Sequence, residues 1–350
     1  MRSWWQGQPG ALAAALRPFS GLYAAAARRE RERLLSEQAE RAPVPVVVVG
    51  NLVVGGAGKT PTVIALVQAF EAAGHHPGVV SRGFGRATQV VAPVRAADDP
   101  RQVGDEPLLI ARRTGVPVWV GRDRLAAARA LCATHPGVDL LISDDGLQHH
   151  ALAREAELIV FDDRGAGNGL LLPAGPLREP LPATLSAHQR VLYTGTRVST
   201  ALPGSMVRRQ AGHAQLLTDW WAGASAAVPL AALRGRRLLA VAGMADPAKF
   251  FDMLEIAGLS IDRWPLPDHH PYTELPWPSD AEDVITTEKD AVKLAADRLP
   301  GLLAPTLRVW VVPLDLKLPA ALVTELAELL FPPPAVTPCA TAPATAPLPT

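Results

Sequence analysis

The chain has 350 residues, more than most single domains, and this length favours two domains. Its composition is 48% hydrophobic and 19% charged, which is typical of a globular protein with a substantial core. The 34 basic residues balance 34 acidic ones, so no nucleic acid partner is expected. Two cysteines, Cys132 and Cys339, exclude a disulfide framework and a cysteine metal cluster and fit a reducing, cytoplasmic setting.

The first 40 residues predict a helix with aromatic and leucine side chains followed by arginines. Its apolar run is interrupted by Arg17 and Pro18 and is too short to span a bilayer. An amphipathic helix at a membrane interface fits this pattern, with arginines near anionic headgroups. A helix packed on the protein's own surface fits it as well. The residues alone leave both interpretations open.

Residues 41–215 predict a doubly wound α/β layer. Val44 to Val49 is a β-branched run interrupted only by Pro45, typical of a fully buried parallel strand. A helix is expected from Pro61 to Ala73, and further strands alternate with helical stretches. These strands are expected at 78–80, 116–120, 139–143 and 158–161.

A second, smaller α/β domain is predicted at 236–331, after a connector at 216–235. Leu238 to Val241, Val284-Ile285 and Val309 to Val312 are its expected strands, and 320–330 its last helix. From 332 to 350 the sequence is mostly proline, alanine and threonine. Such a composition cannot form a core, so this tail is predicted to be disordered.

A glycine-rich segment stands where the first strand turns into a helix. Gly58-Lys59-Thr60 matches the end of the phosphate-loop pattern, although Val53 replaces the usual leading glycine. Successive N–H groups and the helix N-terminus would bind the phosphates of ATP, Lys59 would reach the β- and γ-phosphates, and Thr60 would hold Mg²⁺. The alternative to a phosphate loop is a glycine-rich turn that only lets the helix pack on the strand. The predicted nucleotide-binding residues are Val53, Val54, Gly55, Gly56, Ala57, Gly58, Lys59 and Thr60.

Two acids, Asp144 and Asp145, follow the apolar run 139–143. The carboxyl edge of a parallel sheet is where α/β proteins bind ligands, and carboxylates are the oxygen ligands that Mg²⁺ needs opposite Thr60. One acid could instead cap a helix. We therefore expect Asp144 and Asp145, together with Thr60, to form a magnesium site.

Other polar motifs are weaker when taken singly. Asp105 precedes a helix and could be only a cap, and the histidines of Asp268-His269-His270 could be ordinary surface residues. Arg82 and Arg86 flank flexible glycines and suit an anionic ligand, although they could also be simply solvated. Arg178 lies on a rigid, proline-containing loop. Lys289, after a predicted strand, could approach a phosphate.

Together these segments resemble one family, the tetraacyldisaccharide 4′-kinases of lipid A biosynthesis, over roughly residues 10–330. The resemblance rests on a series of motifs that occur in the same order. Each motif alone is modest evidence, whereas the ordered series is specific. Phe84 stands where the family commonly has tyrosine, and residues 150–155 are less basic than usual. The series comprises 42–52, 55–61, 80–85, 104–107, 144–149, 167–169, 172–179, 267–270 and 287–293.

The resemblance implies transfer of the ATP γ-phosphate to the 4′-hydroxyl of a tetraacylated glucosamine disaccharide 1-phosphate, giving lipid IVA. It implies two α/β/α domains with the site between them, the first a P-loop NTPase-type parallel sheet. It also implies a peripheral or monotopic enzyme on the cytoplasmic face of the inner membrane. The implied catalytic pair is Asp105 with His269. Because two histidines are adjacent, the resemblance leaves open whether His270 is the catalytic one instead. The expected substrate-binding residues are Arg82, Gln148, His149, Asn168 and Arg178.

Two other classes fit part of the sequence. A nucleotide switch or metallochaperone-type ATPase shares the loop, but such proteins usually carry an extra early lysine or paired cysteines, which this chain lacks. A membrane-peripheral binding module with a vestigial loop is contradicted by the intact Lys59-Thr60 and the two strand-end acids. The oligomeric state is not determined by the sequence.

Overall fold

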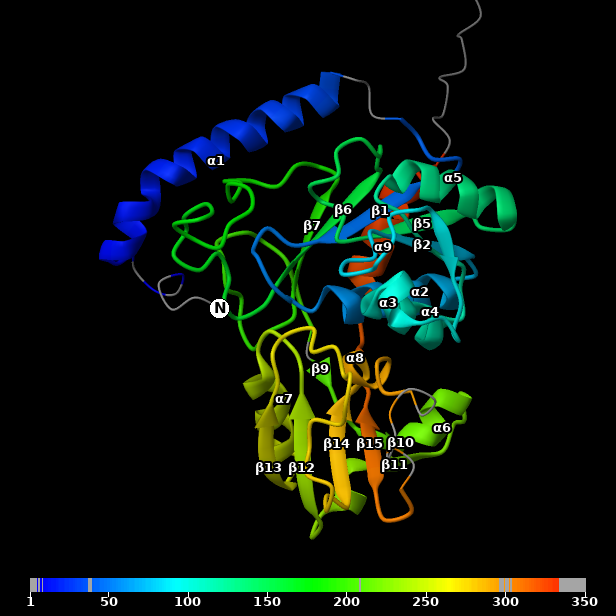
Figure 1. The fold of residues 1–350 in the computed structure, drawn as a ribbon. Helices are drawn as coiled ribbons and strands as arrows, with labels where there is room; N and C mark the ends of the chain where they lie inside the picture. Colours follow the sequence, from blue (N-terminus) through cyan, green and yellow to red (C-terminus); the bar gives the residue numbers. More distant parts are fainter. Residues whose placement is uncertain are drawn as a thin grey trace, which may run out of the picture.

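The computed structural model describes residues 5, 7, 9–36, 40–207, 209–295, 299, 302 and 304–333. Within them the chain forms two mixed α/β units, each built on its own sheet (Figure 1). We call the eight-stranded sheet with its helices the first unit and the six-stranded sheet with its helices the second unit. The predicted disordered tail lies outside the described residues from 334 onward.

The sheet of the first unit has the strand order β3-β4-β2-β5-β1-β6-β7-β8. All neighbouring strands are parallel except β3 and β4. The central strand β1 overlaps the predicted run Val44 to Val49 but begins at Val46 and ends at Gly50, and every residue in it is buried. The strands are β1 (Val46–Gly50), β2 (Pro77–Ser81), β3 (Ala92–Val94), β4 (Val118–Val120), β5 (Leu140–Asp144), β6 (Ala156–Phe161), β7 (Gln189–Tyr193) and β8 (Ser205–Met206).

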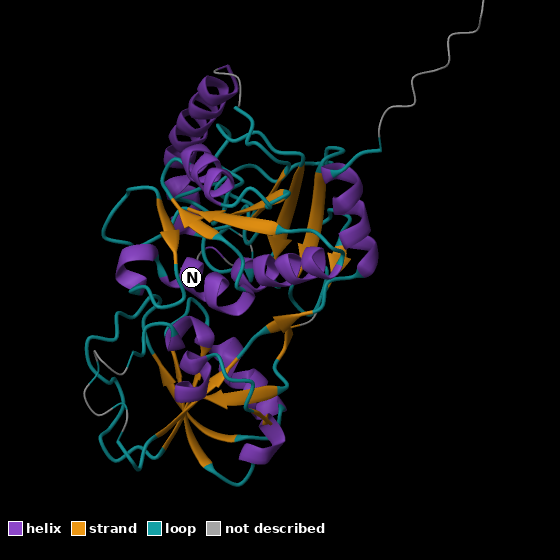
Figure 2. Cartoon of the chain, turned by 90° about the vertical axis from the view of Figure 1, so that its right-hand side faces the viewer, coloured by secondary structure: helices purple, strands orange, loops and turns teal. Residues whose placement is uncertain are grey.

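Helices cover both faces of this sheet because successive side chains of a buried strand point to opposite faces. Val47 and Val49 of β1 pack in the cluster that holds the apolar residues of α2, α4 and α9. Val46 and Val48 pack in a second cluster with α5. Figure 1 labels these helices around the strands of the sheet, and Figure 2 shows the chain turned by 90°. The helices are α2 (Lys59–Ala72), α3 (Pro100–Val103), α4 (Asp105–Thr114), α5 (Arg124–Thr134) and α9 (Ala320–Leu330).

The sheet of the second unit has the order β11-β10-β15-β14-β12-β13. Its strands β12 to β15 are parallel, and β10 and β11 join antiparallel at one edge. A ribbon of β9 (Arg209–Gln210) and β16 (Asp315–Leu316) joins the segments that run between the units. The other elements are β10 (His213–Leu216), α6 (Leu217–Ala222), β11 (Ala227–Pro229), a 3₁₀ turn (Leu230–Leu233), β12 (Arg237–Ala242), α7 (Pro247–Ile256), β13 (Ser260–Pro265), β14 (Asp283–Thr287), α8 (Glu288–Ala291) and β15 (Arg308–Val312).

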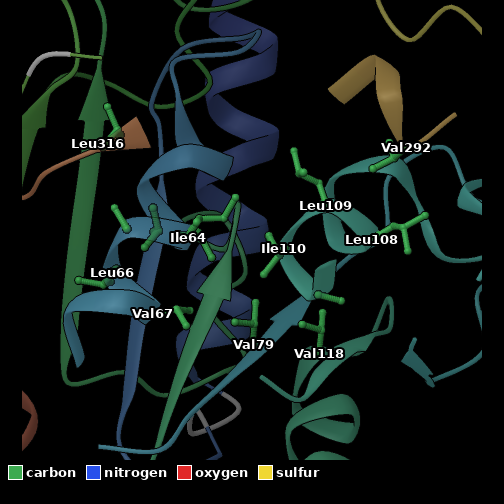
Figure 3. Close-up of a cluster of buried hydrophobic side chains, with 14 of the residues drawn as sticks. Ile64, Leu66, Val67, Val79, Leu108, Leu109, Ile110, Val118, Val292 and Leu316 are labelled. Carbon is green, nitrogen blue, oxygen red and sulfur yellow. The ribbon is translucent and has the colours of Figure 1, made fainter. Parts of the chain in front are cut away.

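The apolar core is continuous between the units. The cluster around α2 and α4 also contains Val292 and Leu316, which come from the C-terminal half of the chain. In Figure 3, Val292 lies beside Leu108 and Leu109 of α4, and Leu316 lies on the side of Ile64 and Leu66 of α2. This shared core gives the two units a defined contact, because buried apolar surface is the main stabilising contribution to packing.

The long helix α1 (Ala11–Ser36) lies at the outside of the first unit, away from both sheets (Figures 1 and 2). It packs on the loop that follows β6: Ser20 Oγ donates to Leu171 O at 2.8 Å, and Tyr23 Oη donates to Arg178 O at 3.0 Å. Large apolar side chains elsewhere on the helix are exposed. Within the described residues no helix has the length and apolarity needed to cross a membrane.

The structure assigns some segments differently from the sequence expectation. Residues 213–229, expected as the end of the first domain and a connector, form β10, α6 and β11, and the two strands belong to the second sheet. Helix α9 begins and ends as predicted, but it contacts α2, β1 and β6 of the first unit. An amphipathic pattern predicts that one face is buried and does not say by which sheet. The domain boundaries themselves stay predictions.

Candidate active site

The glycine loop joins the end of β1 to the start of α2. At Gly55 and Gly58 the backbone has φ values of 96° and 87°, in the region that residues with a Cβ rarely adopt. A Cβ at Gly58 would also lie only 3.0 Å from Thr194 Oγ1. The glycines therefore permit the sharp return of the chain onto the helix N-terminus, which is the arrangement that binds phosphate.

Lys59 is held inside the loop at the first position of α2. Its Nζ donates to Asn51 Oδ1 at 3.1 Å and lies 3.4 Å from Asp145 Oδ1. Asn51 in turn donates to Gly55 O at 3.0 Å. Both Lys59 and Thr60 are largely buried. The ammonium group is thus fixed against the loop.

The first two residues of the predicted nucleotide-binding range have a different setting. Val53 is buried and forms a bridge with Leu177. The N–H of Val54 donates to Pro176 O at 2.9 Å. This part of the range attaches the glycine loop to residues 176–177, and Gly55 to Thr60 form the bend itself.

Asp144 and Asp145 are adjacent in sequence but have opposite environments. Asp144, the last residue of β5, is buried, and only its Oδ2 accepts a hydrogen bond, from Ser81 Oγ at 3.1 Å; Oδ1 has no partner among the described residues. Burial and the nearby charges of Glu106 and Asp145 raise the pKa of Asp144 to about 7. Burial also opposes ionisation of Asp145, but Lys59 and Arg178 outweigh it and lower the pKa of that carboxyl.

The expected magnesium ion fits Asp144 better than Asp145. A buried carboxylate oxygen without a partner is costly and is suited to a cation. Asp145 is already paired, with Lys59 at 3.4 Å and Arg178 at 3.1 Å. No group of three or more His, Cys, Asp or Glu side chains suited to a metal occurs in the described part of the chain. Mg²⁺ bound with nucleotide needs only one or two protein carboxylates, so this donor set is sufficient.

Asp105 and His269 meet where the two units join. Asp105 is buried at the start of α4, and its Oδ2 lies 3.0 Å from Nδ1 of His269. Burial opposes ionisation of Asp105, yet the hydrogen bond from His269 and the charges of Lys289 and Lys293 lower its pKa. The same hydrogen bond, against burial, raises the pKa of His269. The result is an ionised carboxylate held by an imidazole from the other unit.

His269, and not His270, is the histidine that contacts Asp105. His269 has a φ of 57°, a conformation uncommon for a residue with a Cβ, and its exposed neighbour Phe84 has a ring centroid 5.5 Å from the imidazole. His270 instead accepts from the Tyr272 N–H through Nδ1 at 3.2 Å. The geometry therefore separates the two residues of the doublet.

Lys289 and Glu106 also lie at this site, although the sequence predicted no catalytic role for either residue. Lys289 Nζ lies 3.2 Å from Glu106 Oε1, 3.5 Å from Asp268 Oδ1 and 3.4 Å from His269 Nε2. The ammonium thus lies within reach of three acceptors around the imidazole. The Thr-Glu-Lys-Asp motif after a predicted strand was the signal that could have drawn attention to Lys289. Nothing in this motif indicates a contact with Glu106, which lies 183 positions earlier.

Of the predicted substrate-binding residues, Arg178 and Gln148 lie next to Asp145. Arg178 Nη1 donates to Asp145 Oδ1 at 3.1 Å and to Gln148 Oε1 at 3.2 Å. Arg82 is exposed after the end of β2. His149 is partly buried, and burial with the charges of Arg124 and Arg154 lowers its pKa to about 4, so its imidazole is neutral at pH 7.

Asn168 has a local role in the loop after β6. Its Nδ2 donates to Ala174 O at 2.9 Å, and its Oδ1 accepts from the Leu170 N–H at 3.1 Å. The amide thus closes residues 168–174 into a turn, and α1 packs on this turn through Ser20. The structure brings Arg178, Gln148 and Asp145 together and gives Asn168 a supporting position.

A phosphate loop permits several chemistries, and the acid–imidazole pair is suited to transfer of a phosphoryl group to a hydroxyl. The fold and the site define the class of a P-loop kinase. The family model described as tetraacyldisaccharide-1-P 4′-kinase matches residues 12–330. The chain belongs to this family.

The similar proteins agree with this assignment. A tetraacyldisaccharide 4′-kinase of Leptothrix cholodnii is 54% identical over 332 residues, 94% of each chain. That of Herminiimonas arsenicoxydans is 44% identical over 351 residues, again 94% of each. The crystal structure of LpxK from Aquifex aeolicus, described as an “apo” form in complex with ATP, superimposes with a TM-score of 0.72. It is 26% identical and covers 91% of this chain and 100% of that chain.

Proposed function

We propose that this chain transfers the γ-phosphate of ATP to the 4′-hydroxyl of a tetraacyldisaccharide 1-phosphate, the reaction after which its relatives are named. The observation that carries the proposal is the contact of 3.0 Å between Asp105 and His269. It joins the unit that carries the phosphate loop to the second unit. A hydroxyl acceptor needs a carboxylate to receive its proton as the phosphoryl group arrives.

The phosphate loop supplies the ATP site in this proposal. The N–H groups of Gly55 to Gly58 and the start of α2 bind the phosphates, and Lys59 balances their charge. Thr60 and Asp144 would hold Mg²⁺, which supplies positive charge to the β- and γ-phosphates. Asp145 then serves mainly to orient Lys59 and Arg178, with which it is paired.

Asp105 receives the proton of the sugar hydroxyl. Its lowered pKa keeps it ionised at neutral pH, and burial reduces the competition from water. His269 orients the carboxylate from the second unit, so the pair is complete only when the units are in contact. Arg82, Arg178, Gln148 and His149 line the proposed acceptor side, where the arginines match the anionic 1-phosphate.

The membrane surface is the proposed location, on the cytoplasmic face of the inner membrane. Leu12, Phe19 and Leu22 of α1 are 48%, 57% and 70% exposed. A helix with exposed apolar side chains and several arginines binds a bilayer interface. The acyl chains of the substrate would stay in the bilayer while the disaccharide reaches Asp105.

The test is transfer of label from [γ-³²P]ATP to purified tetraacyldisaccharide 1-phosphate in mixed micelles. Label in the lipid, lost in Lys59→Met, is the expected result. Release of free phosphate without labelled lipid would indicate a nucleotide switch and would overturn the proposal. Membrane binding is tested separately by vesicle sedimentation of Leu22→Asp, which we expect to bind less and to retain ATP binding.

A further inference from the structure

Three successive carbonyl groups of the phosphate loop are held by three side chains. Gly55 O accepts from Asn51 Nδ2 at 3.0 Å, Gly56 O from Arg164 Nη2 at 2.6 Å, and Ala57 O from Thr194 Oγ1 at 2.8 Å. These side chains follow β1, β6 and β7, the central strand and its neighbours on one side.

These hydrogen bonds determine where the N–H groups of the loop point. In a planar trans peptide the C=O and the following N–H point in opposite directions. Fixing three carbonyls against side chains directs the N–H groups of Gly56, Ala57 and Gly58 away from those side chains. Such pre-oriented N–H groups bind anions with less ordering cost than a mobile loop.

Arg164 is the donor with a connection to the second unit. Its Nε lies 2.8 Å from both oxygens of Asp162, which is 1% exposed at the end of β6. Asp162 Oδ2 also accepts from Lys249 Nζ of α7 at 2.7 Å. Burial opposes ionisation of Asp162, but Arg164 and Lys249 outweigh it and lower its pKa. The chain of contacts therefore runs from α7 to the carbonyl of Gly56.

We propose that Lys249, Asp162 and Arg164 position the phosphate loop, so that contact of α7 with the first unit raises the affinity for ATP. The proposal rests on the proposed ATP site and adds residues that act through the backbone of the loop. By thermodynamic linkage, bound ATP also strengthens the contact between α7 and the first unit. Closure of the second unit and loading of the nucleotide are coupled through this contact chain.

Substitution of Asp162 separates this role from simple electrostatics. If only charge mattered, Asp162→Asn would strengthen ATP binding, because it removes a negative charge near an anionic ligand. If Asp162 orients Arg164, the same change weakens ATP binding. The two explanations predict shifts of opposite sign.

The experiment is calorimetric titration of the full chain with a non-hydrolysable ATP analogue and Mg²⁺. We expect Arg164→Met and Asp162→Asn each to raise Kd about tenfold, as for loss of a hydrogen bond to a charged group. Lys249→Met should raise it about threefold, as for a partly exposed ion pair. Asp246→Asn, which removes the other carboxylate near Lys249, is the matched control and should leave Kd within twofold.

The double variant Arg164→Met/Lys249→Met tests the connection itself. We expect it to bind no more weakly than Arg164→Met, because Lys249 acts through Arg164. Additive losses would mean that Lys249 acts on the nucleotide directly and would overturn the proposal, as would tighter binding by Asp162→Asn. The KM for the lipid acceptor should stay unchanged, whereas general loosening of the structure would raise it.

Failure of this proposal is distinguishable from failure of the ATP site. If Lys59→Met does not weaken binding of the analogue to the wild-type chain, the proposed ATP site is wrong. If Lys59→Met weakens binding and Arg164→Met does not, only the positioning role is wrong. Arg164→Lys keeps the test decisive where Asp162→Asn does not fold. It retains the positive charge, so electrostatics alone predicts an unchanged Kd, whereas loss of the guanidinium that joins Asp162 to Gly56 O predicts a raised Kd.

Discussion

The two ends of helix α4 both contact the second unit, and they do so in different ways. At its N-terminus Asp105 and Glu106 contact His269 and Lys289. At its C-terminus Arg113 donates to Glu288 at 2.5 Å, and Glu288 also accepts from the Trp220 indole at 3.1 Å. The short helix α8 supplies partners to both ends, Lys289 to one and Glu288 to the other.

The contacts at the two ends of α4 differ in solvent exposure and in whether their charges depend on pH. The side chain of His269 is 34% exposed, whereas that of Glu288 is 6% exposed. Histidine as a residue type can change its charge in the physiological pH range, whereas arginine keeps its charge. We infer that the C-terminal end anchors the units while the N-terminal end performs chemistry. Helix α4 is only about 15 Å long. The contact of Arg113 with Glu288 at its C-terminal end therefore also fixes the position of Asp105 at its N-terminal end.

The largest expected effect comes from the catalytic end. Asp105→Asn removes the proposed proton acceptor and keeps the shape of the side chain, so turnover should fall by about 10²- to 10⁴-fold. The Kd for the ATP analogue should change little. The matched comparison is Asp268→Asn, a carboxylate 3.9 Å from His269 Nε2, whose turnover should fall far less. Equal losses in both variants would contradict a special role for Asp105.

The anchoring end should control stability. Arg113→Met leaves Glu288 buried without its cation, which we expect to lower the free energy of unfolding by about 3 kcal/mol in urea titrations. Arg190→Met breaks a more exposed pair with Glu325 and should cost at most about 1 kcal/mol. A turnover loss in Arg113→Met at full stability would mean that the anchor also takes part in the chemistry.

The sequence predicts each local part of this arrangement. The run at Val46–Gly50 and the glycines after it indicate a buried strand and a phosphate loop, because the signals lie within one short segment. The acids at 144 and 145 follow from the same reasoning. The pairing of Asp105 with His269 came from the resemblance to a family, since the two residues are 164 positions apart.

Long-range contacts account for what the sequence could not predict. The contact of Lys249 with Asp162 spans 87 positions, and neither residue carries a motif that points to the other. Likewise Asp144 and Asp145 look equivalent in sequence. Only the three-dimensional surroundings give Asp145 two cations and leave an oxygen of Asp144 without a partner among the described residues. Burial and charge depend on which elements meet, which periodicity does not encode.

The pH dependence of stability should distinguish the two ends. The pKa of His269 is raised above 6.5 in the folded chain, so its contribution is fully present below about pH 6.5 and is lost as the pH rises through the folded value. The stability gap between wild type and His269→Asn should therefore shrink as the pH rises above about 6.5 in urea titrations. The gap for Arg113→Met should instead widen, because the unpaired Glu288 resists ionisation. Parallel curves would contradict the assignment.

The smallest expected effect comes from Arg112 at the C-terminal end of α4. Its substitution tests whether this end is stabilised by the planar shape of the guanidinium or only by its charge. Arg112 donates to Trp220 O at 2.9 Å and Trp221 O at 2.8 Å, and its guanidinium lies 4.5 Å and 4.1 Å from their ring centroids. Arg112→Lys keeps the charge and loses the planar fork, so unfolding should become easier by about 1 kcal/mol. Turnover at a temperature well below unfolding should stay within twofold. A large loss of turnover without a loss of stability would show that the two ends of α4 do not act separately, because the change lies at the end that carries no proton acceptor.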